Sequence, residues 1–286
     1  MAVYDQSYLT YTGPLTSPWK RFLILPRYAY RAVFQSKLFI VLFIISLVFP
    51  LLASIWVYLH HNAEAMAILN LDLRDLIPIN WRYFYVVAQF QSSFATLLTL
   101  MLAPTLVSKD VENNGLALYL SRPFSRLEYV LGKMSVVLIL LSAVTWVPVL
   151  LLFLFQGYMA GPGWIIENLR LGMAIVVGSW VWILTLCLGS LALSAWIKRK
   201  ITIQGVMIGF YFATAVFAQV INQLFETKWG YLFSLSEAMG SLWYGLFGQT
   251  NRMDLPWAGS GFTIIVFFII SLGLLSRKIR AYEIIN

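Results

Sequence analysis

Six apolar runs, each long enough to cross a lipid bilayer as a helix, constrain this chain more than any other feature of its sequence. A spanning helix needs about 20 mostly apolar residues. The runs are too long and too continuously apolar for membrane β-barrel strands, which are about 10 residues long and alternate in polarity. We therefore predict an all-α integral membrane protein with six transmembrane helices at Leu38–Leu59, Phe84–Val107, Val130–Phe155, Leu171–Ile197, Ile203–Phe225 and Trp257–Ser276.

The composition favours a membrane protein over the one or two soluble domains that 286 residues would otherwise suggest. Only 11% of the residues are charged, against about 25% in soluble domains. The net charge of +8 would suit a nucleic-acid-binding protein, but Lys and Arg also accumulate in the cytoplasmic loops of membrane proteins. We expect a lipid bilayer as the surrounding medium and no nucleic-acid partner.

The basic residues orient the helices. Fifteen of the 20 Lys and Arg residues lie before the first run, between the second and third or at the very start of the third (Lys133), between the fourth and fifth, or after the sixth. Because basic loops stay in the cytoplasm, we predict a multi-pass protein of the inner (cytoplasmic) cell membrane with both termini inside. The prediction is a single transmembrane domain over 1–286, with a cytoplasmic segment at 1–37, a membrane domain at 38–276 and a cytoplasmic tail at 277–286.

Two connections outside the spans are expected to be helical. The start of the chain is polar and does not resemble a signal peptide. Basic and aromatic residues mix just before Leu38, which predicts an amphipathic elbow helix lying on the cytoplasmic face. The connection Glu226–Pro256 mixes polar and apolar residues below spanning length, which predicts short external helices before the sixth span.

A polar insert, SKDVENNGLALYLSRPFSRLEYVLGK, separates the second and third runs. Ser108 can cap a short helix whose first turn contains Asp110 and Glu112, where negative charge is favourable. Pro123 ends that helix, because the residue before a proline avoids the α conformation. The insert is then predicted to be a rigid, charged surface element, although an ordinary solvated loop is the alternative.

The third membrane helix has a strong start signal within the same insert. Ser125 and Glu128 have the spacing of a capping box, in which the two side chains satisfy free backbone N–H groups reciprocally. Phe124 and Tyr129 occupy the flanking positions of a hydrophobic staple. We therefore predict that the helix begins at Ser125.

The insert resembles the segment between the second and third spans in membrane subunits of type-2 ABC exporters. That family pattern has an acidic pair, a glycine, a small or hydroxyl residue, apolar positions, Pro-x-x-Arg and Gly-Lys. The corresponding residues here are Asp110, Glu112, Gly115, Leu116, Pro123, Arg126, Gly132 and Lys133. Leu116 departs from the threonine that the family often has. The elbow, six spans and extra helices before the sixth also look like this family, so the resemblance covers the whole chain.

The resemblance implies a partner and a role for the insert. In that family the segment is a coupling helix that lies in a groove of a separate, cytoplasmic ABC ATPase subunit, which carries the ATP and Mg²⁺. It also implies a second permease copy or paralogue, so that the assembly is a dimer of permeases. The implied ATPase-coupling residues are Asp110, Glu112, Gly115, Leu116, Arg122, Pro123 and Arg126. The charged members are expected to pair with partner side chains or lipid phosphate.

The sequence offers no catalytic or cofactor motif of its own. Gly132-Lys133 is followed by Met134 instead of Ser or Thr, so it is not a Walker A loop. No HExxH or GxSxG occurs, and Cys187 has no spaced Cys or His companions for a metal. We expect a transport subunit that is not an enzyme, with no catalytic residue, metal or cofactor in this chain.

Polar residues in the second and fifth runs are candidates for a translocation path. They are Gln89, Ser92, Ser93, Thr96, Gln219 and Asn222. Bonding between neighbouring helices is the alternative role for such residues. No charged residue lies near the centre of a run, which argues against an ion-coupled carrier.

Together these features predict the permease subunit of an ABC exporter, moving an amphiphilic or lipid-like substrate by alternating access. One alternative is an ABC-type membrane subunit that signals or does mechanical work without cargo. A secondary carrier or an intramembrane enzyme is less favoured, because the runs contain neither central charges nor a converging catalytic set.

Overall fold

The computed structural model describes residues 24–62, 77–103, 108, 126–249 and 255–278, and every regular element in these ranges is a helix. The elements are α2 (Ile24–Phe34), α3 (Lys37–His61), α5 (Trp81–Ala103), α8 (Arg126–Val144), α9 (Trp146–Ala160), α10 (Trp164–Glu167), α11 (Leu169–Trp196), α12 (Lys200–Leu224), η2 (Trp229–Phe233), α13 (Leu235–Leu246) and α14 (Trp257–Lys278). Six helical segments are long and apolar enough to cross a membrane, with α8 and α9 together forming the third. The prediction of six such helices is confirmed.

The described helix ends lie close to the predicted ones except in the third span, and the predicted end of the second span, Val107, lies outside the described residues. The third span was predicted over Val130–Phe155, and the apolar helical stretch covers Glu128–Ala160, 33 residues. A helix of this length is about 50 Å long, which exceeds a hydrocarbon core of about 30 Å. It is interrupted at Thr145, three residues before Pro148, which has no N–H to donate and whose ring crowds the preceding turn.

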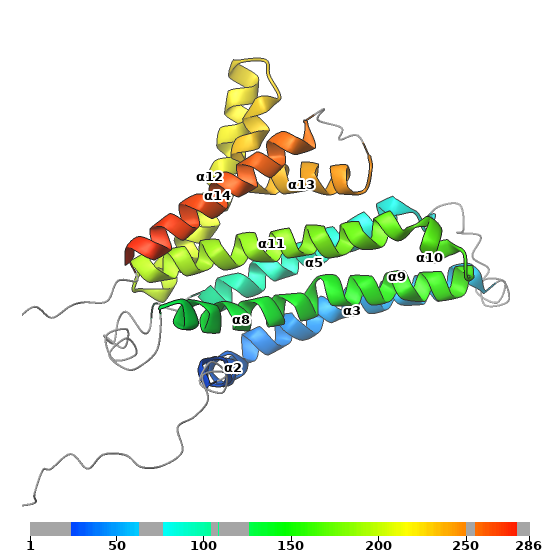
Figure 1. Cartoon of the computed structure of the whole chain (residues 1–286), viewed down its shortest axis with the longest axis horizontal. Helices are drawn as coiled ribbons and strands as arrows, with labels where there is room; N and C mark the ends of the chain where they lie inside the picture. The colour runs from blue at the N-terminus through cyan, green and yellow to red at the C-terminus, as the bar shows by residue number, and fades with distance from the viewer. Residues whose placement is uncertain (1–23, 63–76, 104–107, 109–125, 250–254, 279–286) are drawn as a thin grey trace, which may run out of the picture.

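Five helices, which make up four of the long segments, run alongside one another as a bundle. Figure 1 shows α3, α5, α8, α9 and α11 along the long axis of the molecule, with α12, α13 and α14 on one side of them. In the same view α2 is seen end-on, so it crosses the direction of the long helices, and it packs against α8 and α3. A helix thus occupies the segment predicted as the elbow, and its position at a membrane surface stays a prediction.

α11 is the central helix of the molecule and contacts α5, α8, α9, α13 and α14. Glycines allow this close packing, since each of three accepts an aromatic ring from a different helix. The pairs are Gly172 with Phe153 of α9, Gly178 with Trp243 of α13, and Gly189 with Phe267 of α14. Small residues at helix interfaces are the usual means of packing in membranes, where lipid removes the hydrophobic driving force between helices.

Side chains also tie α5 to its neighbours through hydrogen bonds to backbone carbonyls. Gln91 donates to the Ser46 carbonyl of α3 at 2.9 Å. The indole of Trp182 on α11 donates to the Ser92 carbonyl at 3.1 Å. These bonds hold α5 between α3 and α11.

The surface of the helices is strongly apolar. Ile44 on α3, Phe212 on α12 and Ile269 on α14 are 57%, 64% and 64% exposed. Soluble monomers rarely show such continuous apolar surfaces, whereas lipid covers them readily. Together with the six spans, this surface describes a multi-pass membrane protein.

Basic segments that are far apart in the sequence meet at one end of the bundle. The end of α5, the start of α8, the end of α11, the start of α12 and the end of α14 lie at the left in Figure 1. Lys278 lies over the Trp196 ring, with its Nζ 5.3 Å from the ring centroid, which ties α14 to α11 there. The assignment of this end to the cytoplasm, and the predicted division of the chain at 1–37, 38–276 and 277–286, stay predictions.

Candidate functional site

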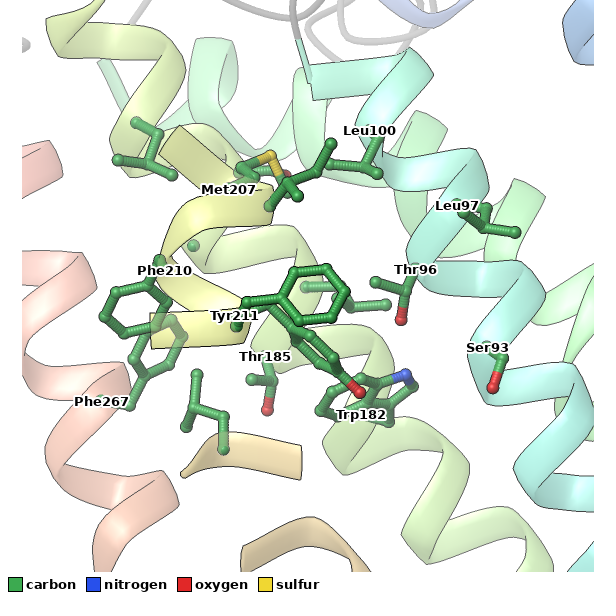
Figure 2. Close-up of a pocket in the computed structure, with 17 residues that line it drawn as sticks. Ser93, Thr96, Leu97, Leu100, Trp182, Thr185, Met207, Phe210, Tyr211 and Phe267 are labelled. Atoms are coloured by element: carbon green, nitrogen blue, oxygen red, sulfur yellow. The ribbon is translucent and has the colours of Figure 1, made fainter. Parts of the chain in front are cut away.

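A cavity of about 460 Å³ lies among α5, α11, α12 and α14. Figure 2 shows Thr96 of α5 and Tyr211 of α12 on opposite sides of this space, with Trp182 and Thr185 of α11 between them. The Phe210 ring of α12 lies beside the Phe267 ring of α14, with 6.3 Å between their centroids. Apolar side chains form most of its wall, and a few hydroxyls interrupt them.

The wall formed by α11 is rigid. Trp182, Thr185 and Ser190 line the cavity and are at most 5% exposed, because α11 is packed on several sides by other helices. The hydrogen bond from Trp182 to the Ser92 carbonyl fixes the indole across the α5–α11 interface. This wall therefore has a fixed shape.

The wall formed by α12 is open. Phe212 on α12 is 64% exposed and Leu97 on α5 is 46% exposed, and both line the cavity. Toward the basic end of the bundle, Gln204 of α12 donates to the Leu100 carbonyl of α5 at 3.1 Å and joins the two helices. The cavity therefore opens sideways between α5 and α12, in the direction that lipid or a neighbouring subunit would occupy.

Three hydroxyls of the cavity wall have already used their protons. Ser93, Thr96 and Thr185 each donate to the carbonyl four residues earlier in their own helix, at 3.0, 2.9 and 2.8 Å. A hydroxyl has one proton and two acceptor lone pairs. These groups consequently present acceptor lone pairs to whatever enters the cavity.

A small polar side chamber of about 20 Å³ adjoins the cavity. Its lining residues are Gln89, Ser92, Ser93, Thr96, Trp182, Tyr211, Ser236, Met239 and Trp243, and four of these also line the larger cavity. Its volume is enough for about one water molecule or a group of similar size. The indole N–H of Trp243, which is 1% exposed, has no hydrogen-bond acceptor in the structure.

The predicted path residues divide into two groups. The structure brings Gln89, Ser92, Ser93 and Thr96 together around the side chamber. Gln219 and Asn222 line neither the cavity nor the side chamber. Gln219 is exposed on α12, and the Asn222 Oδ1 accepts a hydrogen bond from the Gly230 N–H at 2.7 Å, which joins α12 to η2.

Three further helices, α11, α12 and α13, contribute residues to this site that were not predicted from the sequence. Thr185 on α11, Tyr211 on α12 and Trp243 on α13 were not predicted as site residues, although each carries a polar group within an apolar stretch. That polarity was the available signal. A polar residue in an apolar run does not reveal which neighbouring helix its side chain faces, because a helix that is apolar all round has no preferred face.

The predicted coupling residues are largely beyond the described residues. Asp110, Glu112, Gly115, Leu116, Arg122 and Pro123 fall in the segment 109–125, which lies outside the described ranges. Arg126 is the first residue of α8, immediately after the predicted cap at Ser125. The start of α8 lies at the same end of the bundle as the other basic segments.

The site has few groups with which to perform chemistry. In the described parts of the chain, no group of three or more His, Cys, Asp or Glu residues is placed to hold a metal. The described lining of the cavity and of the side chamber contains no Asp, Glu, Lys, Arg or His. The arrangement is suited to binding an apolar body with a few hydrogen bonds.

Comparisons with known proteins do not assign the chain to a family, since no protein-family model and no curated protein sequence matches it.

Proposed function

We propose that this chain is the permease subunit of an ABC exporter of the second type. It would pair with a second permease and with two cytoplasmic ATPase subunits that bind ATP and Mg²⁺. The observation that carries the proposal is the charged, proline-interrupted stretch between α5 and α8, which resembles a coupling helix. Its two flanking helices end and begin at the basic end of the bundle, which supports a cytoplasmic position.

The packing of α5 supports a mechanical link from this stretch to the cavity. Ser93, Thr96, Leu97 and Leu100 of α5 line the cavity, and α5 ends three residues after Leu100. A force applied to the coupling segment would act on the end of α5, so it would move one wall of the cavity against the rigid wall of α11. ATP binding and hydrolysis on the partner would in this way alternate the access of the site.

The lining of the cavity supports an amphiphilic cargo. An ion would need charged or densely polar ligands within the membrane, and the described lining offers a few hydroxyls among apolar side chains. An apolar body with limited hydrogen bonding matches these walls.

The test is co-purification from the native cells. The tagged full chain is expected to retain a protein that contains a Walker A motif and to show ATPase activity. Replacing Asp110, Glu112 and Arg126 together by alanine should reduce the recovered ATPase by about 10-fold or more, since losing three charged contacts costs more than about 1.4 kcal/mol.

Arg82→Ala is the matched control. Arg82 is exposed at the start of α5, at the opposite end of that helix from the coupling segment, and its contact is with the neighbouring Trp81 ring. This variant should retain the ATPase. A triple variant that retains the partner at the wild-type level, or a chain that never binds an ATPase, would refute the proposal.

A further inference from the structure

We infer that the cavity and its side chamber bind an uncharged amphiphile whose head group is a hydroxyl or an amide. The apolar chain or ring system of the ligand occupies the cavity, and a hydroxyl or the amide of the head group enters the side chamber. This inference rests on the proposed function, because it names the class of cargo that the exporter would carry.

The dimensions fit one small amphiphile. Small-molecule sites usually have volumes of roughly 300–1,000 Å³ and a mostly apolar lining with a few polar groups. The cavity has about 460 Å³, and the side chamber of about 20 Å³ shares Ser93, Thr96, Trp182 and Tyr211 with it. The two spaces therefore form one site with an apolar part and a small polar end.

The lining excludes a charged head group. The described residues that line the cavity and the side chamber include no acid, Lys, Arg or His. A carboxylate or an ammonium group in such a site would lose its hydration without gaining an opposite charge, which costs several kcal/mol. Fatty acids and alkylammonium ions are consequently poor ligands.

Trp243 lines the side chamber and is the donor that we assign to the head group. Its ring stacks on Phe247, with 5.5 Å between centroids, and its six-membered ring contacts the backbone of α11 at Gly178. These contacts fix the indole, whose N–H is buried without an acceptor. A buried donor without a partner is unfavourable, so a ligand oxygen that accepts from Trp243 is stabilised.

Two hydroxyls of the site require the head group to donate as well. The hydroxyls of Ser93 and Thr96 present lone pairs, because their protons are bonded to carbonyls of α5. A hydroxyl or an amide can accept from Trp243 and donate to these oxygens. A plain hydrocarbon can do neither, and an ether or an ester cannot donate.

The side opening provides a route for such a ligand from the membrane. Leu97 of α5 and Phe212 of α12 are exposed at the cavity, while Thr185 of α11 behind them is buried. An amphiphile dissolved in the bilayer can therefore enter with its chain along the exposed apolar rim and its head group toward α13.

The test uses 1-decanoylglycerol with a diazirine in its chain as the probe, and the full chain in lipid nanodiscs. After irradiation, mass spectrometry should find the label on the cavity-facing parts of α5 and α12. Unlabelled 1-decanoylglycerol should compete, whereas decanoate and decyltrimethylammonium should compete at least about 10-fold less well, since each would bury an unpaired charge.

Two variants test the head-group contact. Trp243→Phe should weaken competition by 1-decanoylglycerol by about 2- to 10-fold, as expected for one lost hydrogen bond, and Tyr211→Phe tests the same chamber without touching the packed core. Trp180→Phe on α11, which lines neither chamber, is the matched control and should not change the competition. Circular dichroism and gel filtration establish that each variant is folded.

The possible outcomes separate this inference from the proposed function. Labelling spread evenly over the lipid-facing helices, equal competition by decanoate, or unchanged competition in both Trp243→Phe and Tyr211→Phe would overturn the inference. An ATPase that still co-purifies in that case leaves the exporter proposal standing. Labelling of the cavity in a chain that binds no ATPase would refute the exporter proposal and leave the inferred ligand class standing.

Discussion

α11 and α12 are similar in length and hydropathy, but α11 is buried among other helices and α12 is mostly exposed. They contain 28 and 25 residues, and both are apolar enough to span a membrane. Within the most apolar 18 residues of each, 67% are buried in α11 and 11% in α12. Hydropathy therefore identifies spanning helices and does not distinguish the helix that organises the bundle from one at its edge.

Glycines show the physical origin of the difference. On α11, a Cβ added at Gly178 would lie 2.7 Å from the Trp243 ring, and one at Gly189 would lie 2.9 Å from the Phe267 ring. On α12, Gly205 and Gly209 have no neighbouring atom within 4 Å of such a Cβ. The same residue type is thus a packing site on one helix and open surface on the other.

The cavity lies between these two helices, so it has one fixed wall and one wall that is lightly held. In the described part of the chain, α12 contacts α5, α11, η2 and α13, but most of its side chains are exposed. A site that must change its access needs such an asymmetry, because packed interfaces resist deformation and open ones do not.

The largest expected effect comes from filling a packed glycine. Gly178→Leu forces the Trp243 ring away from α11, and overpacking of this kind costs about 1–3 kcal/mol. Gly209→Leu on α12 enters open space and should leave stability within about 0.5 kcal/mol of the wild type. Unfolding in SDS–detergent mixtures, followed by circular dichroism, measures both variants. Equal stability of the two variants would show that the glycines of α11 and α12 do not differ as described.

A smaller effect is expected from the hydrogen bond that fixes the rigid wall. Trp182→Phe removes the donor to the Ser92 carbonyl, and a bond of this type contributes about 1 kcal/mol. The same unfolding measurement detects the loss, and Trp180→Phe on the same helix is the matched control. A wild-type unfolding curve for Trp182→Phe would mean that the α5–α11 interface is held by packing alone.

The sequence predicted the helices well because each apolar run carries its own length and boundaries. The fourth span was expected at Leu171–Ile197 and is α11, Leu169–Trp196. Capping chemistry placed the start of the third helix at Ser125, and α8 begins at Arg126. Such features are local, so they can be recognised without knowledge of the neighbours.

The site was predictable only where a single helix carries it. Gln89, Ser92, Ser93 and Thr96 have the spacing of one helix face, so their meeting in the structure follows from α5 alone. Thr185, Tyr211 and Trp243 reach the same place from three other helices. Their convergence depends on tertiary packing, which a single apolar sequence does not encode in its periodicity.

Asn222 shows that a polar residue within a predicted span can have a structural role instead of lining the site. Its amide was a candidate for the path, and in the structure its Oδ1 accepts from the Gly230 N–H at 2.7 Å. Asn222→Ala should therefore loosen the junction between α12 and η2 and leave the cavity intact. The exchange rate of the Gly230 amide should rise by about 2- to 10-fold, which corresponds to one lost hydrogen bond.

Because α12 contributes little to the packed core, global stability should change by less than about 0.5 kcal/mol in Asn222→Ala, the smallest of the three effects. Hydrogen exchange read by mass spectrometry separates the local from the global change. Gln219→Ala, one turn earlier and exposed, should leave both unchanged. If Asn222→Ala instead unfolded α11 together with α12, the two helices would form one cooperative unit, and α12 could not move as a separate wall of the cavity.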